Sequence, residues 1–292
     1  MSQPDFIHNN HATSYEYISP LQHDLAGKHV LITGAAWLDG VGAATATAYA
    51  RAGASVIAIC DIHEISGDIE ARLLAAAADA GRSKPVIVTG HVDISNLASV
   101  QALRDHFSSA LDSRLDILVN NAAVMEPMGN LLDADPDVYW QTWEVNIRGL
   151  FNMTRTFLPM LLSTRGLCTI INVASSGALS PRPLSSGYRT SKLAVLRWTE
   201  NTQLDFADSG LLMYCVNPGA IKTQITVAQP DTVRNMLPHK PEMAGDTIVW
   251  LSAERREWLA GRYVSCPWDL EELMARKEEI MEDDKLKMRM VY

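Results

Sequence analysis

Cysteine is scarce in this chain. The 292 residues contain four, and no two have the C-x-x-C spacing of a redox or metal-binding pair. Cys60, Cys168, Cys215 and Cys266 each lie in or beside an apolar run, which predicts buried, reduced thiols. The eight histidines show no H-E-x-x-H or comparable spacing. We therefore expect neither a disulfide framework nor a bound metal.

Membrane-directed segments and an excess of positive charge are also missing. No apolar run approaches the roughly 20 residues that a membrane span needs, and residues 1–20 have neither the basic start nor the apolar segment of a signal peptide. The net charge of −9 disfavours nucleic acid and anionic membrane surfaces as partners, because both repel such a chain. These absences predict a soluble, cytoplasmic protein.

Short β-branched runs alternate with longer helical stretches over most of the chain. The apolar runs are continuous, which is typical of parallel strands covered on both faces. This alternation predicts an α/β fold, a doubly wound, Rossmann-like parallel sheet of about seven strands with right-handed crossovers and flanking helices. Strands are expected at 29–34, 55–61, 85–93, 116–123, 168–176, 212–219 and 261–266, with helices at 67–81, 97–107, 138–162 and 186–207.

The chain reads as one domain with two appended ends. No linker rich in Pro, Gly or Ser and no internal repeat divides residues 26–267. Residues 1–25 are polar and are expected to form an irregular extension strapped over the surface. Apolar side chains at helical spacing in residues 268–292 predict a C-terminal helix lying on the body or on a neighbouring subunit, with a partner-recognition helix as the alternative.

The stretch VLITGAAWLDGVG places a glycine-rich turn between the first strand and an alanine-rich helix. Gly34 allows a tight turn, and Gly40, Val41 and Gly42 bring the backbone N–H groups of a helix start close to a phosphate. Asp61 ends the next strand about 20 residues beyond, where a carboxylate can hydrogen-bond the ribose hydroxyls of adenosine. The arrangement predicts a dinucleotide cleft. The alternative is a plain glycine turn that Asp61 caps.

Five residues separate Gly34 from Gly40, and the last of them is an anion. We expect this insertion to bulge outward and to leave the helix start intact. Asp39 would weaken binding if it faced a pyrophosphate, so we expect it to point to solvent or to act as an N-cap. No basic residue lies in this loop or directly after Asp61 to compensate a 2′-phosphate. NAD is therefore favoured over NADP.

Tyr188 and Lys192 stand four apart in SSGYRTSK, so they share one face of a helix. A tyrosine with a pKa of about 10 must lose roughly three units to act as a base near neutrality, at a cost of about 4 kcal/mol. A neighbouring ammonium and a positively charged nicotinamide are the simplest sources of that stabilisation. Y-x-x-x-K alone is common as an exposed helical pair, so its meaning depends on the surrounding motifs.

Those motifs carry a resemblance. TG…GVG, NNAA, VASS, YRTSK and NPGAIKT stand in the order and spacing of the classical short-chain dehydrogenases/reductases, and the match covers about residues 25–266. The N-terminal strap and the ERREWLAGRY stretch also resemble members from filamentous fungi. The resemblance implies an NAD(P)-dependent oxidoreductase that forms a homodimer or homotetramer through the helices containing Asn146 and Tyr188.

The resemblance also implies a catalytic set. Ser175 would hydrogen-bond the substrate oxygen, and Tyr188 would donate or accept the proton. Lys192 would bind the nicotinamide ribose and lower the pKa of the tyrosine. Asn146 would hold a water that links Lys192 to bulk solvent, whereas Ser176 is expected to be structural.

Further motifs match cofactor-binding positions of the family. Asp93 and Ile94 would contact the adenine, residues 121–123 would follow its ribose, and residues 218–223 would fix the nicotinamide carboxamide and the phosphate. The implied cofactor-binding residues are Gly34, Gly40, Val41, Gly42, Asp61, Ile62, Asp93, Ile94, Asn121, Ala122, Ala123, Tyr188, Lys192, Pro218, Gly219, Ile221 and Thr223.

Three features depart from the family pattern. The phosphate loop is two residues longer than usual, Ala123 replaces a glycine, and SCPWDLEEL stands where many members have Asp-Gly-Gly. None of the three removes a catalytic residue.

The substrate pocket is expected from MEPMGN, GALSPRPL and residues 224–245, which are rich in methionine and poor in fixed charge. This composition indicates a medium-sized, largely apolar alcohol or ketone such as a secondary metabolite, although methionine is also ordinary core filler. The expected reaction is hydride transfer between NAD(H) and a carbon bearing oxygen, with oxidation of an alcohol as the preferred direction. The alternatives are a lyase or isomerase on the same scaffold and a cofactor-binding regulatory protein.

Overall fold

The computed structural model describes residues 6–164, 166–227 and 229–290. Its centre is a seven-stranded sheet in the order β3-β2-β1-β4-β5-β6-β7, with every neighbouring pair parallel. This confirms the predicted doubly wound sheet. The strands are β1 (His29–Thr33), β2 (Val56–Asp61), β3 (Val86–His91), β4 (Ile117–Asn120), β5 (Thr169–Val173), β6 (Leu212–Asn217) and β7 (Tyr263–Ser265).

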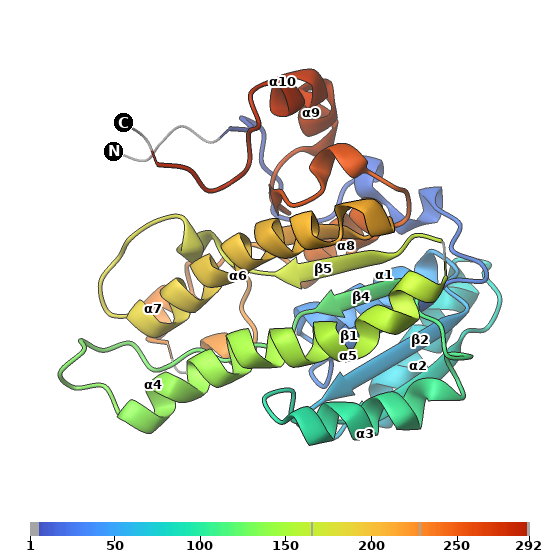
Figure 1. Cartoon of the computed structure of the whole chain (residues 1–292), viewed down its shortest axis with the longest axis horizontal. Helices are drawn as coiled ribbons and strands as arrows, with labels where there is room; N and C mark the ends of the chain where they lie inside the picture. Colours follow the sequence, from blue (N-terminus) through green and yellow to red (C-terminus); the bar gives the residue numbers. More distant parts are fainter. Residues whose placement is uncertain (1–5, 165, 228, 291–292) are drawn as a thin grey trace.

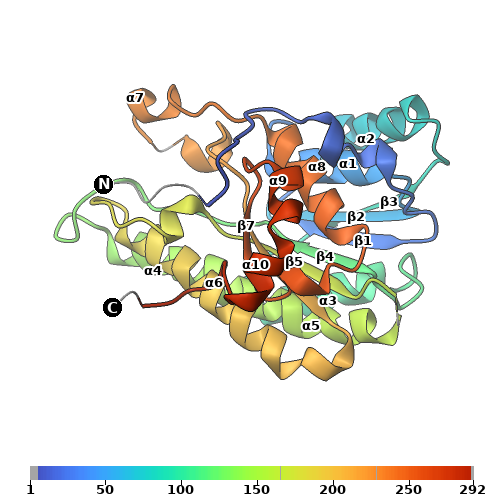
Figure 2. The same cartoon turned by 90° about the horizontal axis from the view of Figure 1, so that it is seen from above.

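Helices cover both faces of the sheet, and Figure 2 shows the strands between the two helical layers. One layer contains α1 (Val41–Arg51), α2 (Gly67–Asp79) and α8 (Pro241–Ser252). The other contains α3 (Leu97–Ser108), α4 (Pro136–Trp143), α5 (Leu150–Ser163) and α6 (Ser186–Asp205). A π-helical stretch, η3 (Glu144–Gly149), joins α4 to α5 so that the two form one long rod (Figure 1).

The inner strands are buried along their whole length, as their continuous apolar runs predict. β3 differs from that prediction, because its residues are partly or fully exposed and Val86 is 54% exposed. The reason is its position, since β3 forms an edge of the sheet and its outer side has no neighbouring strand.

The two ends of the chain pack against each other at the top of the molecule in Figure 1. The predicted single C-terminal helix is instead two short ones, α9 (Leu270–Ala275) and α10 (Lys277–Glu282). The helix breaks at Arg276, and Ile280 of α10 is buried. Glu272 accepts the backbone N–H groups of His8 and Asn9 at 3.0 and 3.1 Å, so the N-terminal strap lies on the C-terminal tail. Residues 1–5 of the predicted extension and residues 291–292 of the tail lie outside the described residues.

All four cysteines are free and buried, as predicted. Among the described residues, no helix has the length and apolar character required to cross a membrane.

The close crossing of α1 and α8 gives a test of the fold. A Cβ on Gly245 would lie 2.7 Å from the backbone oxygen of Ala44. We expect Gly245→Ala to lower the free energy of unfolding by about 1–3 kcal/mol, because the two helices must move apart. Gly67→Ala is the matched control, since a Cβ there meets nothing within 4 Å. Urea unfolding of the two variants measures the difference, and equal stability would contradict the tight crossing.

Candidate active site

The predicted site residues meet at the carboxyl ends of β1, β4, β5 and β6. In Figure 1 these ends point to the left, where α4 and the short helix α7 (Asp231–Arg234) project beyond the sheet. The strand order reverses between β1 and β4, and ligands of doubly wound sheets bind beside such a reversal.

The phosphate loop, residues 34–40, follows β1 and ends at α1. Gly34 has φ +72°, and a Cβ on Gly42 would lie 2.2 Å from the Gly34 carbonyl oxygen. Glycine is therefore required at both positions. Gly40 is the N-cap of α1 and has an extended conformation, and Val41 begins the helix. The first N–H groups of a helix have no intrahelical acceptor, so this helix start can receive an anion.

The longer loop extends away from this helix start. Trp37, Leu38 and Asp39 are exposed. A hydrogen bond from the Gly40 N–H to the Trp37 carbonyl oxygen (2.8 Å) closes the turn at the end of the loop. Arg72 of α2 donates to the Leu38 carbonyl oxygen at 2.8 Å and so ties the loop down from outside. Asp39 is not the N-cap, because Gly40 takes that position. Of the two expectations for Asp39, exposure to solvent is the correct one.

Asp61 is buried at the end of β2, and both of its oxygens are already engaged. Oδ2 accepts the Ala36 N–H at 2.9 Å, and Oδ1 accepts the His63 N–H at 3.0 Å. Asp61 therefore caps the glycine turn, as the structural alternative predicts. A carboxylate oxygen accepts two hydrogen bonds, however, so each oxygen retains capacity for a ribose hydroxyl. Ile62 lies beside it with its side chain exposed.

The NNAA motif holds the phosphate loop in place. The Asn121 side-chain amide donates to the carbonyl oxygens of Thr33 and Gly34 at 2.9 and 3.0 Å. In return, the Thr33 hydroxyl oxygen accepts the N–H groups of Asn121 and Ala122 at 3.0 and 2.9 Å. β1 and β4 are thus locked together at the point where the dinucleotide cleft begins. Ala123 follows as a half-buried residue.

The two residues predicted at the adenine lie after β3. Asp93 Oδ1 accepts the backbone N–H and the hydroxyl of Ser95 at 2.9 and 2.6 Å. Ile94 is buried against Gly149, where an added Cβ would lie 2.6 Å from its side chain. The residues keep this segment against the η3–α5 junction.

The predicted catalytic side chains lie together. Ser175 follows β5, and its hydroxyl oxygen accepts the Gly177 N–H at 3.0 Å. Tyr188 stands in the first turn of α6, is within hydrogen-bond reach of Ser175, and has the Lys192 ammonium 5.8 Å from its ring centroid. Ser176 belongs to a 3-10 turn, and its N–H donates to the Asn217 side chain at 3.0 Å.

The protein's own groups keep the Tyr188 phenol protonated. Burial raises the pKa of Tyr188, and the Glu126 carboxylate raises it further, while the Ser175 hydrogen bond and the Arg189 charge lower it. The groups around Tyr188 therefore leave its pKa above the usual value for tyrosine.

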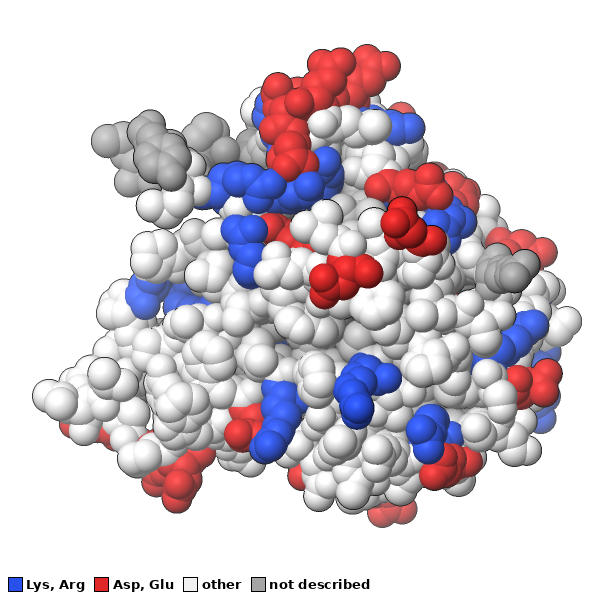
Figure 3. Space-filling view, in the orientation of Figure 1, with Lys and Arg blue, Asp and Glu red and all other residues white. Residues whose placement is uncertain are grey.

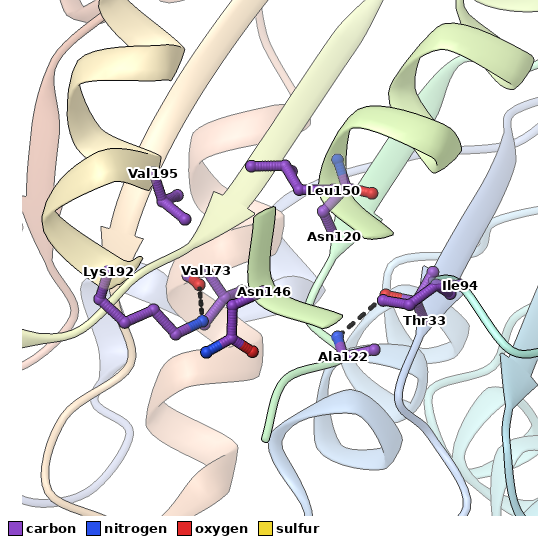
Figure 4. A pocket seen from close by; sticks show the side chains of 9 residues that line it. All are labelled: Thr33, Ile94, Asn120, Ala122, Asn146, Leu150, Val173, Lys192 and Val195. Carbon is purple, nitrogen blue, oxygen red and sulfur yellow. Dashed lines mark hydrogen bonds between the residues drawn. The ribbon is translucent and has the colours of Figure 1, made fainter. Parts of the chain in front are cut away.

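Lys192 is 3% exposed, and its ammonium donates to the Val173 carbonyl oxygen at 2.8 Å. Burial lowers the pKa of Lys192 to about 8. Figure 4 shows Lys192 and Asn146 extending toward the same small cavity. The cavity lining is Thr33, Ile94, Asn120, Ala122, Asn146, Leu150, Val173, Lys192 and Val195. Polar groups from four different elements therefore surround a space beside the ammonium.

Asn146 lies within the π-helical stretch η3, a wider turn that often marks a functional site. Its side chain donates to the Val124 carbonyl and accepts the Val124 N–H, at 2.9 and 3.0 Å. It also donates to the Ser191 hydroxyl at 3.0 Å. Asn146 therefore connects the segment after β4 to the helix that carries Tyr188 and Lys192.

The NPGAIKT segment follows β6 on the other side of the cleft. The side-chain oxygen of Asn217 accepts the Gly219 N–H at 3.2 Å, and Gly219 has φ +104°. Ile221 is buried, and Thr223 caps the short turn Gln224–Thr226. Pro218 lies between these fixed points.

Two charged residues beside Tyr188, Glu126 in MEPMGN and Arg189 in YRTSK, are not among the predicted site residues. Glu126 is 7% exposed, and its Oε1 accepts the Tyr188 N–H at 2.9 Å. Arg189 donates to the Ser185 hydroxyl and the Ser180 carbonyl at 2.6 and 3.0 Å, so it orders the GALSPRPL segment. A single acid inside the apolar run AAVMEPM is the sequence signal that could have identified Glu126.

The predicted pocket segments also come together. The Gly129 N–H donates to the Leu184 carbonyl at 3.0 Å, which joins MEPMGN to GALSPRPL. Gln229, in the 224–245 segment, contacts the Met125 sulfur with its side-chain amide at 3.3 Å.

Comparison with known proteins agrees with this geometry. Residues 28–234 match the family described as short chain dehydrogenase. The short chain dehydrogenase mpl6 of Monascus purpureus is 41% identical over 286 residues, which cover 98% of this chain and 96% of that protein. The short chain dehydrogenase andI of Emericella variicolor is 37% identical over 286 residues, with the same coverage of each chain.

Solved structures show the same fold. The 3-ketoacyl-(acyl-carrier-protein) reductase of Brucella melitensis, complexed with NADH, has a TM-score of 0.71 at 28% identity and covers 83% of this chain and 97% of its own. The chain belongs to the short-chain dehydrogenase family and is an NAD(P)-dependent oxidoreductase.

Glu126 gives a structural test of the site. Glu126→Ala removes the acceptor of the Tyr188 N–H, whereas Glu126→Gln keeps an oxygen in its place. We expect the alanine variant to have a free energy of unfolding about 1–2 kcal/mol below that of the glutamine variant. Urea unfolding of both variants checks this, and equal stability would contradict the capping contact.

Proposed function

We propose that this protein interconverts a secondary alcohol and a ketone by hydride transfer to or from NAD(H), with Tyr188 as the general acid or base. The observation that carries the proposal is the juxtaposition of Tyr188, Ser175 and Lys192, with Lys192 lining the same cavity as Thr33 at the end of β1. The nicotinamide supplies or accepts the hydride when it is bound.

Proton movement follows from the environment of Tyr188. In the reductive direction the protonated phenol donates to the substrate oxygen, which the Ser175 hydroxyl also contacts. In the oxidative direction the phenolate accepts the alcohol proton, and a positively charged nicotinamide would oppose the effect of burial on the tyrosine pKa. Lys192 binds the nicotinamide ribose, and Asn146 organises the cavity that connects its ammonium to water.

The cofactor-binding residues fit a dinucleotide. The N–H groups that begin α1 receive the pyrophosphate, with Gly34, Gly40, Val41 and Gly42 allowing its approach. The free lone pairs of Asp61 receive the adenosine ribose beside Ile62. Asp93 and Ile94 hold the adenine, residues 121–123 follow its ribose, and residues 218–223 hold the nicotinamide.

NAD is the preferred cofactor in this proposal. The buried Asp61 carboxylate would repel a 2′-phosphate. Arg72 is a cation that contacts the phosphate loop, and its guanidinium is engaged by Leu38 O and by Glu242, 3.7 Å away. The related Brucella melitensis reductase was solved with NADH.

The substrate is a medium-sized, largely apolar molecule such as a secondary metabolite. The segments that meet around Tyr188 present exposed apolar side chains, including Met128, Leu179 and Leu184. Apolar lining with few polar groups is typical of small-molecule sites.

A homodimer or homotetramer is formed through α4, α5 and α6. Trp140 on α4 is 62% exposed, Leu204 on α6 is 73% exposed, and Phe151 on α5 is also exposed. Figure 3 shows that the face over these helices carries few charged side chains, whereas acids gather over α9 and α10. Exposed aromatic and apolar residues of this kind are characteristic of subunit contacts.

The catalytic assignment is tested by Tyr188→Phe. We expect turnover to fall by at least about 10²-fold, because the substrate oxygen loses its proton partner, while the Kd for NADH changes little. The change in nicotinamide absorbance measures turnover with a panel of apolar secondary alcohols and ketones. Tyr139→Phe, on the neighbouring helix α4, is the control. Retained turnover in Tyr188→Phe would refute the assignment, and conversion without any absorbance change would indicate a lyase or isomerase.

The cofactor preference is tested by Asp61→Asn. We expect NADH affinity to fall and the ratio of NADPH to NADH affinity to rise about tenfold or more, because one unit of negative charge is removed from the ribose site. Fluorescence titration with both cofactors measures this, and Asp68→Asn, an exposed acid of α2, is the control. An unchanged ratio would contradict the role of Asp61.

A further inference from the structure

His239 and Ala220 form a reciprocal backbone and side-chain contact. The Ala220 N–H donates to His239 Nδ1 at 2.8 Å, and the His239 N–H donates to the Ala220 carbonyl oxygen at 3.1 Å. Ile221 also pairs with His239 in an isolated parallel bridge. These contacts bring together the two ends of a loop whose described residues are 222–227 and 229–238, and we call it the 222–238 loop. We call this set of contacts the loop neck.

The loop neck lies directly against the backbone assigned to the nicotinamide. A Cβ on Gly219 would lie 3.0 Å from His239 Nδ1, so the imidazole packs on that glycine. On the opposite side, the Asn217 side chain holds the Gly219 N–H. The Pro218–Ile221 backbone is therefore fixed from one side by β6 and from the other by a single imidazole.

The neck is supported from outside by the N-terminal strap. The Lys240 N–H donates to the Ala12 carbonyl oxygen at 2.9 Å, one residue after His239 and one before α8. The helix beyond is anchored by Asp246, which accepts from Ser14 at 2.5 Å and pairs with Arg51. His239 thus directly precedes a segment that the strap and α1 hold in place, and the 222–238 loop lies on its other side in the sequence.

We propose that neutral His239 is a positioning residue that closes the 222–238 loop and holds the Pro218–Ile221 backbone in place for the nicotinamide. The consequence for cofactor binding rests on the proposed function. The closure itself rests on the contacts above.

The chemistry of imidazole makes this contact depend on pH. Nδ1 can accept the Ala220 N–H only when it carries no proton, so the proton of the neutral ring is on Nε2. Burial lowers the pKa of His239 below its usual value of 6.5. The contact is therefore complete at neutral pH and is lost as the pH falls through that lowered pKa, when Nδ1 becomes a second donor facing a donor.

Other titratable groups stand on the segments that meet at the neck. They are Lys222 and Lys240, Glu242 at the start of α8, and His11 of the strap with its partner Asp269 at 2.8 Å. His11 carries a second imidazole, on the strap that contacts Lys240, so it requires its own control.

The test uses two substitutions at His239. Asn places an amide oxygen where Nδ1 lies and cannot be protonated in this range, whereas Leu offers no acceptor. His11→Gln preserves a donor to Asp269 without a titratable ring, and Lys240→Ala changes the neighbouring exposed side chain alone.

The first measurement is hydrogen exchange of the full-length chain without cofactor, at pH 8 and at a series of lower pH values, with rates corrected for the intrinsic effect of pH. We expect peptides covering residues 217–224 and 236–241 to exchange about tenfold faster in His239→Leu than in the unsubstituted chain at pH 8. We expect the unsubstituted chain to lose this protection as the pH falls through the lowered pKa of His239, and His239→Asn to keep it at every pH.

The second measurement is the Kd for NADH by fluorescence over the same pH range. We expect roughly tenfold weaker binding for His239→Leu at pH 8, substantial rescue in His239→Asn, and a loss of affinity at low pH that His239→Asn abolishes and that His11→Gln and Lys240→Ala retain.

The outcomes separate this inference from the proposed function. NADH binding that is equal and equally pH-dependent in all variants, with unchanged exchange at the neck, would overturn the role of His239 and leave the proposed function standing. Protection that follows the expected pattern in a chain that binds no NADH would support the closure and refute the proposed function. A pH dependence abolished by His11→Gln instead would assign the switch to the strap.

Discussion

The hydrogen bonds between Asn121 and the end of β1 are the constraint on which the rest of the site depends. They hold the carbonyl oxygens of Thr33 and Gly34 against the strand that follows in the sheet, at the point where strand order reverses. Gly42 then packs against the Gly34 carbonyl so closely that no side chain fits between them. The position of the α1 start follows from this contact. Consequently, the longer phosphate loop extends outward without displacing the cleft.

Opposing charges surround Tyr188. The Glu126 carboxylate raises the pKa of the tyrosine, whereas the Arg189 guanidinium lowers it. Burial raises the same pKa, so the phenol holds its proton at neutral pH. Lys192 is also buried deeply enough that its own pKa is lowered to about 8. In the proposed function, the charge of the oxidised cofactor would favour release of the phenol proton.

The fold could be predicted because each buried strand has a continuous apolar run and each phosphate-facing glycine is required locally. The features that could not be predicted depend on contacts between segments distant in the sequence. Nothing in the residues near β3 indicates that it is an edge strand, and no Gly or Pro marks the break between α9 and α10 at Arg276. Local motifs identified Tyr188 and Lys192, but Glu126 acts through a hydrogen bond that joins positions 62 residues apart. The contact of His239 with Ala220 likewise could not be predicted, because it forms only when the two ends of the 222–238 loop come together.

The docking of the strap on the tail has a consequence for biosynthesis. The contacts of His8 and Asn9 with Glu272 join residues 264 and 263 positions apart. During translation residues 8 and 9 cannot take this position until Glu272 has been synthesised. The Rossmann body can assemble in the meantime from contacts nearer in sequence, since its strands add in neighbouring order on both sides of β1. Docking of the strap on the tail therefore follows the synthesis of residue 272, and the same strap supports residue 240.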